Sequence, residues 1–211
     1  LSNIYLAVLD LLWTRHSAPL GTLVRYADDF VVLSRTKSEC EEGEARIRTI
    51  LGRLGLELHP EKTRRVELFG GKEGFDFLGC HLHQRLSGPL FEKVGRKIYF
   101  LHRWPSQRSM QRIRQRVKEL TPRSRCHADL RVVIADLNPV LRGWGNYFRT
   151  GNAAKRFNQL DTYVWQRLLR LRLARKGRNL QPGEVKRWTR ESFRNLGLHQ
   201  LMGTVRYPET A

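Results

Sequence analysis

Apolar residues follow a helical spacing in the first segment of the chain and alternate with polar residues in the next. Residues 3–14 carry an apolar pattern that is mostly helical. Two β-rich runs, 23–26 and 30–33, then flank Ala27-Asp28-Asp29. Because Asp is disfavoured inside strands and common in turns, this pattern predicts a hairpin with two acids at its tip.

Residues 38–54 have the apolar stripe of an amphipathic helix. Ser38 is the predicted N-cap, with Glu41 at the spacing of a capping box. Gly55 is expected to end the helix, because a glycine often adopts the left-handed conformation just after a helix.

Further alternation predicts short strands at 56–58, 63–69, 75–83 and 97–101. Beyond them the apolar spacing becomes helical. The expected helices are 106–120, 128–148, 153–175 and 184–193. The pattern therefore predicts an α+β unit followed by a helical bundle.

The charge is distributed unevenly along this pattern. The 211 residues carry a net charge of +19, yet residues 1–84 hold 11 Lys and Arg against 12 Asp and Glu. Residues 85–211 hold 28 Lys and Arg against 8 acids. Since 40% of the residues are hydrophobic, the chain supports a packed core and is not a disordered basic tail. The basic half indicates a polyanionic partner.

The cysteines indicate a reducing compartment. Cys40, Cys80 and Cys126 are odd in number and widely spaced, so they form neither a disulfide framework nor a CxxC metal clamp. We expect a cytoplasmic protein, with no signal peptide and no membrane partner, because no apolar run approaches the roughly 18 residues of a membrane span. Leu1 leads at once into an apolar helix, so we expect the chain to start inside a domain.

Two adjacent acids on a tight turn repel each other, and a divalent cation gives a reason for their presence. Mg²⁺ prefers carboxylate oxygens and keeps positions open for substrate phosphates. The alternative is a solvated turn that happens to contain Asp28 and Asp29. The flanking residues favour the cation: an aromatic Tyr26 and a small Ala27 precede the acids, and an apolar strand follows them.

Tyr26-Ala27-Asp28-Asp29 resembles the YADD box of the reverse transcriptases encoded by group II introns, the maturases. Other segments resemble this family in the same order along essentially the whole chain. They are 1–6 in the palm helix, 55–63 in the following block, 75–79 in the hairpin that grips the primer, 137–148 and 157–171 in the maturase (thumb) region, and 196–198 with 204–208 near the end.

The resemblance implies part of a polymerase palm, an antiparallel sheet with helices, at residues 1–101. An all-α thumb and maturase region would follow at 102–211. It also implies an RNA-directed DNA polymerase, a nucleotidyltransferase of a mobile element, with a role in RNA splicing. Its partners would be intron RNA, an RNA template, a DNA primer and dNTPs; the oligomeric state is left open.

The resemblance also implies roles for the acids and their neighbours. Asp28 would be a metal ligand and Asp29 its less essential neighbour, in a two-metal Mg²⁺ site. Tyr26 and Ala27 would lie near the incoming nucleotide and the primer end. Lys62 occupies the place of a lysine proposed to protonate the leaving pyrophosphate; it could instead contact triphosphate as a point charge or be a solvated turn residue.

Phe77, Leu78 and Gly79 match the primer-grip hairpin, a role that is compatible with Phe77 also being a core residue. Gly79 would let the backbone approach nucleic acid closely. Next to them, Cys80, His81 and His83 invite a metal site. A strand, however, would turn Cys80 away from the two histidines, and no further ligand is evident.

Arginines and aromatics are interleaved in the basic half, a combination that suits RNA because bases stack on rings while arginines bind phosphates. The alternative interpretation is that Trp144 and Phe148 belong to the core of the helical bundle. We expect both interpretations to hold, with the apolar side chains inside the bundle and Arg142 and Arg149 on its surface. The expected RNA-binding residues are Arg142, Trp144, Tyr147, Arg149, Arg167, Arg170, Arg172, Arg175, Lys176 and Arg178.

Three functions are compatible with these features. In this family a further carboxylate comes from a strand before the YADD hairpin, and it has no counterpart here, nor do the fingers. We therefore expect an N-terminally truncated polymerase with maturase activity, inactive in synthesis by itself. The alternatives are a non-catalytic maturase remnant that assists intron RNA folding, and a generic basic RNA-binding protein with coincidental motifs.

Overall fold

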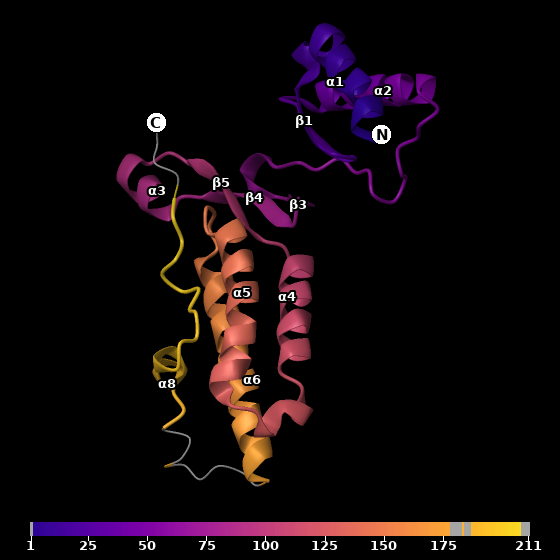
Figure 1. Cartoon of the computed structure of the whole chain (residues 1–211). Coiled ribbons are helices and arrows are strands. Elements are labelled where there is room, and N and C mark those ends of the chain that lie inside the picture. The colour runs from indigo at the N-terminus through magenta and orange to yellow at the C-terminus, as the bar shows by residue number, and fades with distance from the viewer. Residues whose placement is uncertain (1, 178–182, 184–186, 208–211) are drawn as a thin grey trace. The chain divides into compact units, whose positions relative to one another are not determined.

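The computed structural model describes residues 2–177, 183 and 187–207 and contains two compact units, Leu1–Glu67 and Leu68–Ala211 (Figure 1). The predicted α+β class is confirmed, because both helices and two small antiparallel sheets are present. No helix in this described part of the chain is long and apolar enough to cross a membrane.

Two helices and one hairpin make up the first unit. Its elements are α1 (Ser2–His16), the 3₁₀ turn Ala18–Leu20, β1 (Thr22–Tyr26), β2 (Asp29–Leu33) and α2 (Lys37–Arg53). Leu9, Trp13 and Ile47 from the two helices are buried, and Leu23 and Phe30 of the hairpin pack against them. The hairpin is thus fixed to a helical layer through one of its faces.

The N-cap predicted for α2 is wrong. Thr36, not Ser38, caps the helix: its hydroxyl accepts from the Glu39 backbone N–H at 3.2 Å. The Glu39 carboxylate accepts in return from the Thr36 N–H at 3.0 Å. Thr36 and Glu39 thus form a reciprocal capping box two residues before the predicted one. Gly55 follows the helix with a φ of 68°, as predicted.

The strands predicted at 56–58 and 63–69 are also wrong. Among the described residues these segments join no sheet; a turn lies between them, and 69–71 form a short 3₁₀ helix. Leu58 alone of the first segment packs against the core of the unit. The alternation of apolar and polar residues in 56–58 thus reflects one side chain that packs into the core. It does not indicate a strand, because the backbone of this segment has no neighbouring strand to pair with in the described part of the chain.

A three-stranded antiparallel sheet opens the second unit, with the order β3 (Gly74–Phe77), β4 (Cys80–Leu86), β5 (Tyr99–Pro105). The strand predicted at 97–101 is thus found, shifted toward the C-terminus. Between β4 and β5 lies a short helix, α3 (Gly88–Val94), that the apolar pattern did not predict.

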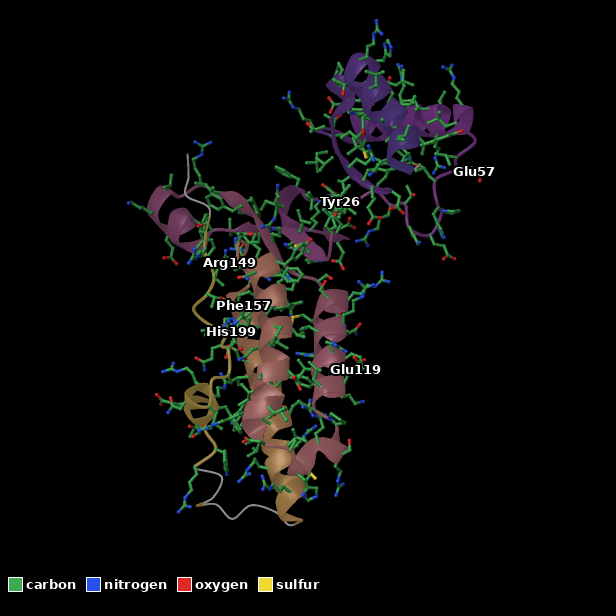
Figure 2. The ribbon with its side chains drawn as sticks, viewed as in Figure 1. Tyr26, Glu57, Glu119, Arg149, Phe157 and His199 are labelled. Carbon is green, nitrogen blue, oxygen red and sulfur yellow. The ribbon has the colours of Figure 1, made fainter. Side chains whose placement is uncertain are left out.

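Helices form the rest of the second unit (Figure 1). They are α4 (Gln107–Leu120), the 3₁₀ helix Arg123–His127, α5 (Leu130–Phe148), α6 (Ala154–Lys176) and α8 (Arg190–Asn195). Leu137, Phe157 and Leu168 are fully buried between them, and Figure 2 labels Phe157 inside the bundle. The first three predicted helices are confirmed. Part of the fourth, 184–193, lies outside the described residues.

Polar side chains of α5 and α6 hold the final described segment, 196–207, along the bundle. Asn138 donates to the Gly197 carbonyl at 2.8 Å and accepts from the His199 N–H at 2.8 Å. The buried Asp161 carboxylate accepts from the N–H groups of Leu201 and Met202, at 3.1 and 2.8 Å. Both side chains therefore replace the partners that a sheet would give to this extended backbone.

Replacing Asp161 with Ala is expected to destabilise the second unit by about 2–4 kcal/mol, because two N–H groups would lose their acceptor. Urea unfolding measures this loss, and hydrogen exchange at Leu201 and Met202 should accelerate. Asp161→Asn keeps one acceptor oxygen and should cost less. Equal stability of the Ala variant and the native chain would contradict this account of the segment.

Candidate active site and nucleic-acid interface

The two acids lie at the tip of the β1–β2 hairpin. Tyr26 pairs with Asp29, so Ala27 and Asp28 alone form the loop. Asp29 begins β2 instead of lying in the turn as predicted. Ala27 has a φ of 54°, a left-handed conformation that is costly for a residue with a Cβ. Tyr26 is 66% exposed (labelled in Figure 2), and both carboxylates are exposed as well.

The Asp28 and Asp29 carboxylates have the donor chemistry that Mg²⁺ requires. Within the described residues, neither one forms a hydrogen bond or an ion pair, so their oxygens are available to a cation. Two oxygen donors side by side fit a hard divalent ion. They form an incomplete ligand set, since the described part of the chain contains no group of three or more metal-ligating side chains.

Asp10 and Arg25 form an ion pair next to this hairpin and were not predicted from the sequence. Arg25 of β1 donates from Nε to Asp10 Oδ1 of α1 at 2.9 Å, and its Nη2 also contacts Asp10. Its Nη1 donates to the Ala27 carbonyl at 2.7 Å. A signal was present, because each residue interrupts an apolar face: Asp10 lies between Leu6 and Trp13 on α1, and Arg25 follows Leu23 on β1.

Lys62 lies in an irregular turn of the first unit. The N–H groups of Lys62 and Thr63 both donate to the His59 carbonyl, at 3.2 and 3.0 Å. The Lys62 side chain is exposed. The turn thus presents this ammonium group to solvent.

The predicted primer-grip residues form the tight β3–β4 hairpin of the second unit. Leu78 and Gly79 make its two-residue loop, with φ of 48° and 75°, between the paired Phe77 and Cys80. The Leu78 carbonyl accepts from the Tyr147 hydroxyl of α5 at 2.9 Å.

The other half of that loop is fixed to α4. The Gly79 carbonyl accepts from the Ser109 hydroxyl at 2.7 Å and from the Ser106 N–H at 2.9 Å. A Cβ at position 79 would come within 2.9 Å of the Ser109 oxygen. The close approach expected of Gly79 is thus made to α4, and the hairpin tip is anchored by the helical bundle.

Cys80, His81 and His83 separate on β4 as predicted. Cys80 is buried in the core, and burial raises the pKa of its thiol. His81 pairs with Asp76 at 2.6 Å, and its ring lies 5.1 Å from that of Trp104. His83 stacks beside His81 with ring centroids 6.1 Å apart.

On α5 the predicted interface residues divide between core and surface. Trp144 is half-buried against Phe148, with ring centroids 4.7 Å apart. Arg142 and Tyr147 are exposed. Arg149 caps the helix and is half-buried (labelled in Figure 2).

The arginines of α6 also divide between those that contact the rest of the bundle and those that are exposed. Arg167 is half-buried and caps α4, donating from Nε to the Thr121 hydroxyl at 2.9 Å and from Nη2 to the Thr121 carbonyl. Arg172 lies over the Trp188 ring, 4.4 Å from its centroid. Arg170 and Arg175 are exposed. The side chain of Lys176 and the whole of Arg178 lie outside the described residues.

A pocket of about 610 Å³ lies where α4 and α6 end, and Thr121 and Gly177 are among the residues that line it. Arg123, Arg167 and Arg170 contribute to its lining, and no acid is found among the described residues around it. Positive charge therefore gathers there with no carboxylate to neutralise it, which suits a phosphate.

Two family models match this chain in succession. Residues 1–82 match the model described as reverse transcriptase (RNA-dependent DNA polymerase). Residues 110–188 match the model described as group II intron, maturase-specific domain. The first match contains the acidic hairpin and the second contains α5 and α6. The chain belongs to the group II intron reverse transcriptase/maturase family. No curated protein matches it.

The two matches confirm the family resemblance. The reverse transcriptase match ends at residue 82 inside β4, and thus includes Phe77, Leu78 and Gly79 at the tip of the hairpin. The maturase match begins at residue 110 in α4. The Tyr147–Leu78 and Ser109–Gly79 hydrogen bonds therefore join the reverse transcriptase segment to the helical bundle.

Two histidines of the second unit, His102 and His199, make its stability depend on pH. Burial lowers the pKa of His102, with Arg85 and His83 adding to the effect. Burial and Arg142 lower the pKa of His199. Since the unfolded pKa is about 6.5, the unfolded chain binds more protons below that pH, and stability is lost as the pH falls through this region.

We therefore expect the urea unfolding midpoint of the protein to decrease when the pH falls below about 6.5. His199→Gln should flatten this dependence in part, because one group that titrates is removed. His16→Gln is the matched control, since His16 is exposed at the end of α1. Identical profiles for the native chain and His199→Gln would exclude His199 as a source.

Proposed function

We propose that this protein is an RNA-directed DNA polymerase that transfers nucleotides in a two-metal Mg²⁺ site, with Asp28 and Asp29 as ligands, and that its helical bundle binds intron RNA. One observation carries the proposal. In the segment matched to reverse transcriptases, a tight hairpin exposes two adjacent carboxylates that no described residue neutralises.

Each residue around the hairpin has a defined part in this proposal. Bound Mg²⁺ would stabilise the charge on the attacking and leaving oxygens of the phosphoryl transfer. Asp28 and Asp29 would hold the cation, and a complete palm would add a further carboxylate to the ligand set. Tyr26 and Ala27 lie beside the acids, where the primer end and the incoming dNTP would bind.

Lys62 is proposed to act on the triphosphate. Its exposed ammonium group would donate a proton to the leaving pyrophosphate or bind it as a point charge. Binding the phosphates requires only the positive charge of Lys62, whereas protonating the pyrophosphate requires Lys62 to lose a proton during the reaction.

The nucleic acid is proposed to be held by the second unit. Phe77, Leu78 and Gly79 would support the primer strand, and their anchoring by Tyr147 and Ser109 keeps the hairpin rigid. Arg142, Arg149, Arg170 and Arg175 would bind phosphates, with Lys176 and Arg178 continuing this set. Trp144 supports the helix from within, and Arg167 and Arg172 contribute charge while they hold the fold.

We propose the functional division at residues 101 and 102, with the palm before it and the thumb and maturase region after it. The change from sheet to helix lies shortly after this division, because β5 ends at Pro105 and Ser106 is the N-cap of α4. This division differs from the two compact units, which part at Glu67 and Leu68.

Primer extension on an RNA template tests the polymerase. It should be measured for this chain alone and for this chain joined to the fingers and front palm of a group II intron reverse transcriptase. We expect extension by the joined protein only, and its loss when Mg²⁺ is chelated. No extension by either protein, with intron RNA still bound tightly, would instead favour a non-catalytic maturase that assists RNA folding.

A further inference from the structure

The Arg25 side chain joins α1 to the turn that carries the acids. It leaves β1 on the same face as Leu23, which packs against the core, and the whole side chain is only 13% exposed. Three of its partners are fixed by the fold: the Asp10 carboxylate, the Ala27 carbonyl at 2.7 Å and the Asn3 side-chain oxygen at 3.2 Å. An isolated surface ion pair would not require this number of partners.

The bond to Ala27 restrains the peptide that leads into Asp28. A peptide group is planar, so the Ala27 carbonyl and the Asp28 N–H turn together. Arg25 holds that carbonyl and thereby fixes the plane from which the Asp28 side chain departs. It also offsets the cost of the left-handed Ala27, whose φ is 54°.

The bond to Asp10 has a second consequence. A guanidinium next to Asp28 and Asp29 would by itself attract their carboxylates and compete with a cation. Asp10 occupies Nε and Nη2 of Arg25, and no described residue forms an ion pair with Asp28. Asp10 is therefore an anchor for the arginine and leaves the two hairpin carboxylates to the cation.

We propose that Arg25 is a positioning residue of the metal site: held by Asp10, its guanidinium fixes the Ala27–Asp28 peptide so that the Asp28 carboxylate is presented to a divalent cation. This rests on the proposed function, because it takes Asp28 as a cation ligand. It adds a residue pair, Asp10 and Arg25, that sits behind the reacting groups and does not touch the substrate.

Cation affinity of the chain as it stands provides the test. Tb³⁺ is the probe, since its luminescence is excited through a nearby tyrosine and Tyr26 adjoins the acids. Arg25→Lys keeps the charge but loses the planar fork that reaches two partners at once. We expect its Tb³⁺ affinity to be about tenfold lower, as the loss of a charge-assisted hydrogen bond implies. Arg46→Lys, which alters an exposed pair with Glu42, should bind as the native chain does.

Asp28→Asn separates this inference from the proposed function. If Asp28→Asn leaves Tb³⁺ binding unchanged, the metal-ligand role of Asp28 fails. If Asp28→Asn weakens binding and a folded Arg25→Lys does not, the positioning role alone is overturned. A role limited to stability would lower the melting temperature of Arg25→Lys without changing cation affinity.

Asp10→Asn decides the outcome if Arg25→Lys does not fold. It keeps the Arg25–Ala27 bond but weakens the hold on the guanidinium, which then becomes free to pair with Asp28. Weaker Tb³⁺ binding by Asp10→Asn would support the positioning role. Native affinity would overturn it.

Discussion

Asp28→Asn is expected to lower the rate of primer extension by about 10³-fold in a protein that carries a complete palm, because a metal ion supplies several kcal/mol of transition-state stabilisation. The amide keeps the size and one oxygen of the side chain, so the hairpin should stay folded. Single-turnover extension on an RNA template, with saturating dNTP, measures the chemical step directly.

Affinity for the RNA template should be nearly unchanged in Asp28→Asn, since the acid repels phosphate in the absence of a cation. Asp29→Asn should have a smaller effect on extension, as the family resemblance implies. Glu57→Gln is the matched control, because Glu57 is an exposed acid of the same unit (Figure 2). Extension by Asp28→Asn at the native rate would refute the metal-ligand role.

RNA affinity of the chain is expected to fall by about 10³-fold between 50 and 200 mM salt, the loss that corresponds to roughly six phosphate contacts. The reason is the distribution of charge: residues 85–211 hold 28 Lys and Arg against 8 acids. Released counterions drive such binding, so a plot of log affinity against log salt should be linear and steep. Filter binding or fluorescence anisotropy with intron RNA measures the slope.

Single arginines should change that slope in proportion to their exposure. Arg142→Ala, Arg170→Ala and Arg175→Ala each remove an exposed guanidinium, and each should reduce the slope by about one. Arg46→Ala, in the nearly neutral first unit, should leave it unchanged because its charge is paired with Glu42. A flat salt profile of the native chain would exclude a phosphate-binding bundle.

Local sequence patterns predicted the hairpin and the helices because their signals lie within a few residues. The alternation on both sides of Asp28 predicts β1 and β2, and the apolar spacing from Phe157 to Leu171 predicts α6. The same reasoning failed for 56–58 and 63–69, where alternation was present but no second strand was within reach. Thr36 and Ser38 each begin a Ser/Thr-x-x-Glu pattern, so this pattern alone does not distinguish the observed N-cap, Thr36, from the predicted one, Ser38.

The residues that support the site lie far apart in sequence, and pattern reasoning had no means to join them. Asp10 and Arg25 are on different elements, and Tyr147 meets Leu78 across 69 positions. Whether Arg167 faces RNA or caps α4 depends on where α4 ends relative to α6, which local spacing does not specify.

The sequence by itself determined the family, the α+β class, the acidic hairpin and the basic character of the second half, because each depends on residue type and local spacing. The tertiary structure alone decided which charged groups are free to act. Asp28 and Asp29 have no ion-pair partner among the residues that the structure describes, while Asp10 is bound to Arg25. Arg170 is exposed, while Arg167 is half-buried. The physical reason is that a partner is found through packing in three dimensions, which brings together side chains that no short pattern connects.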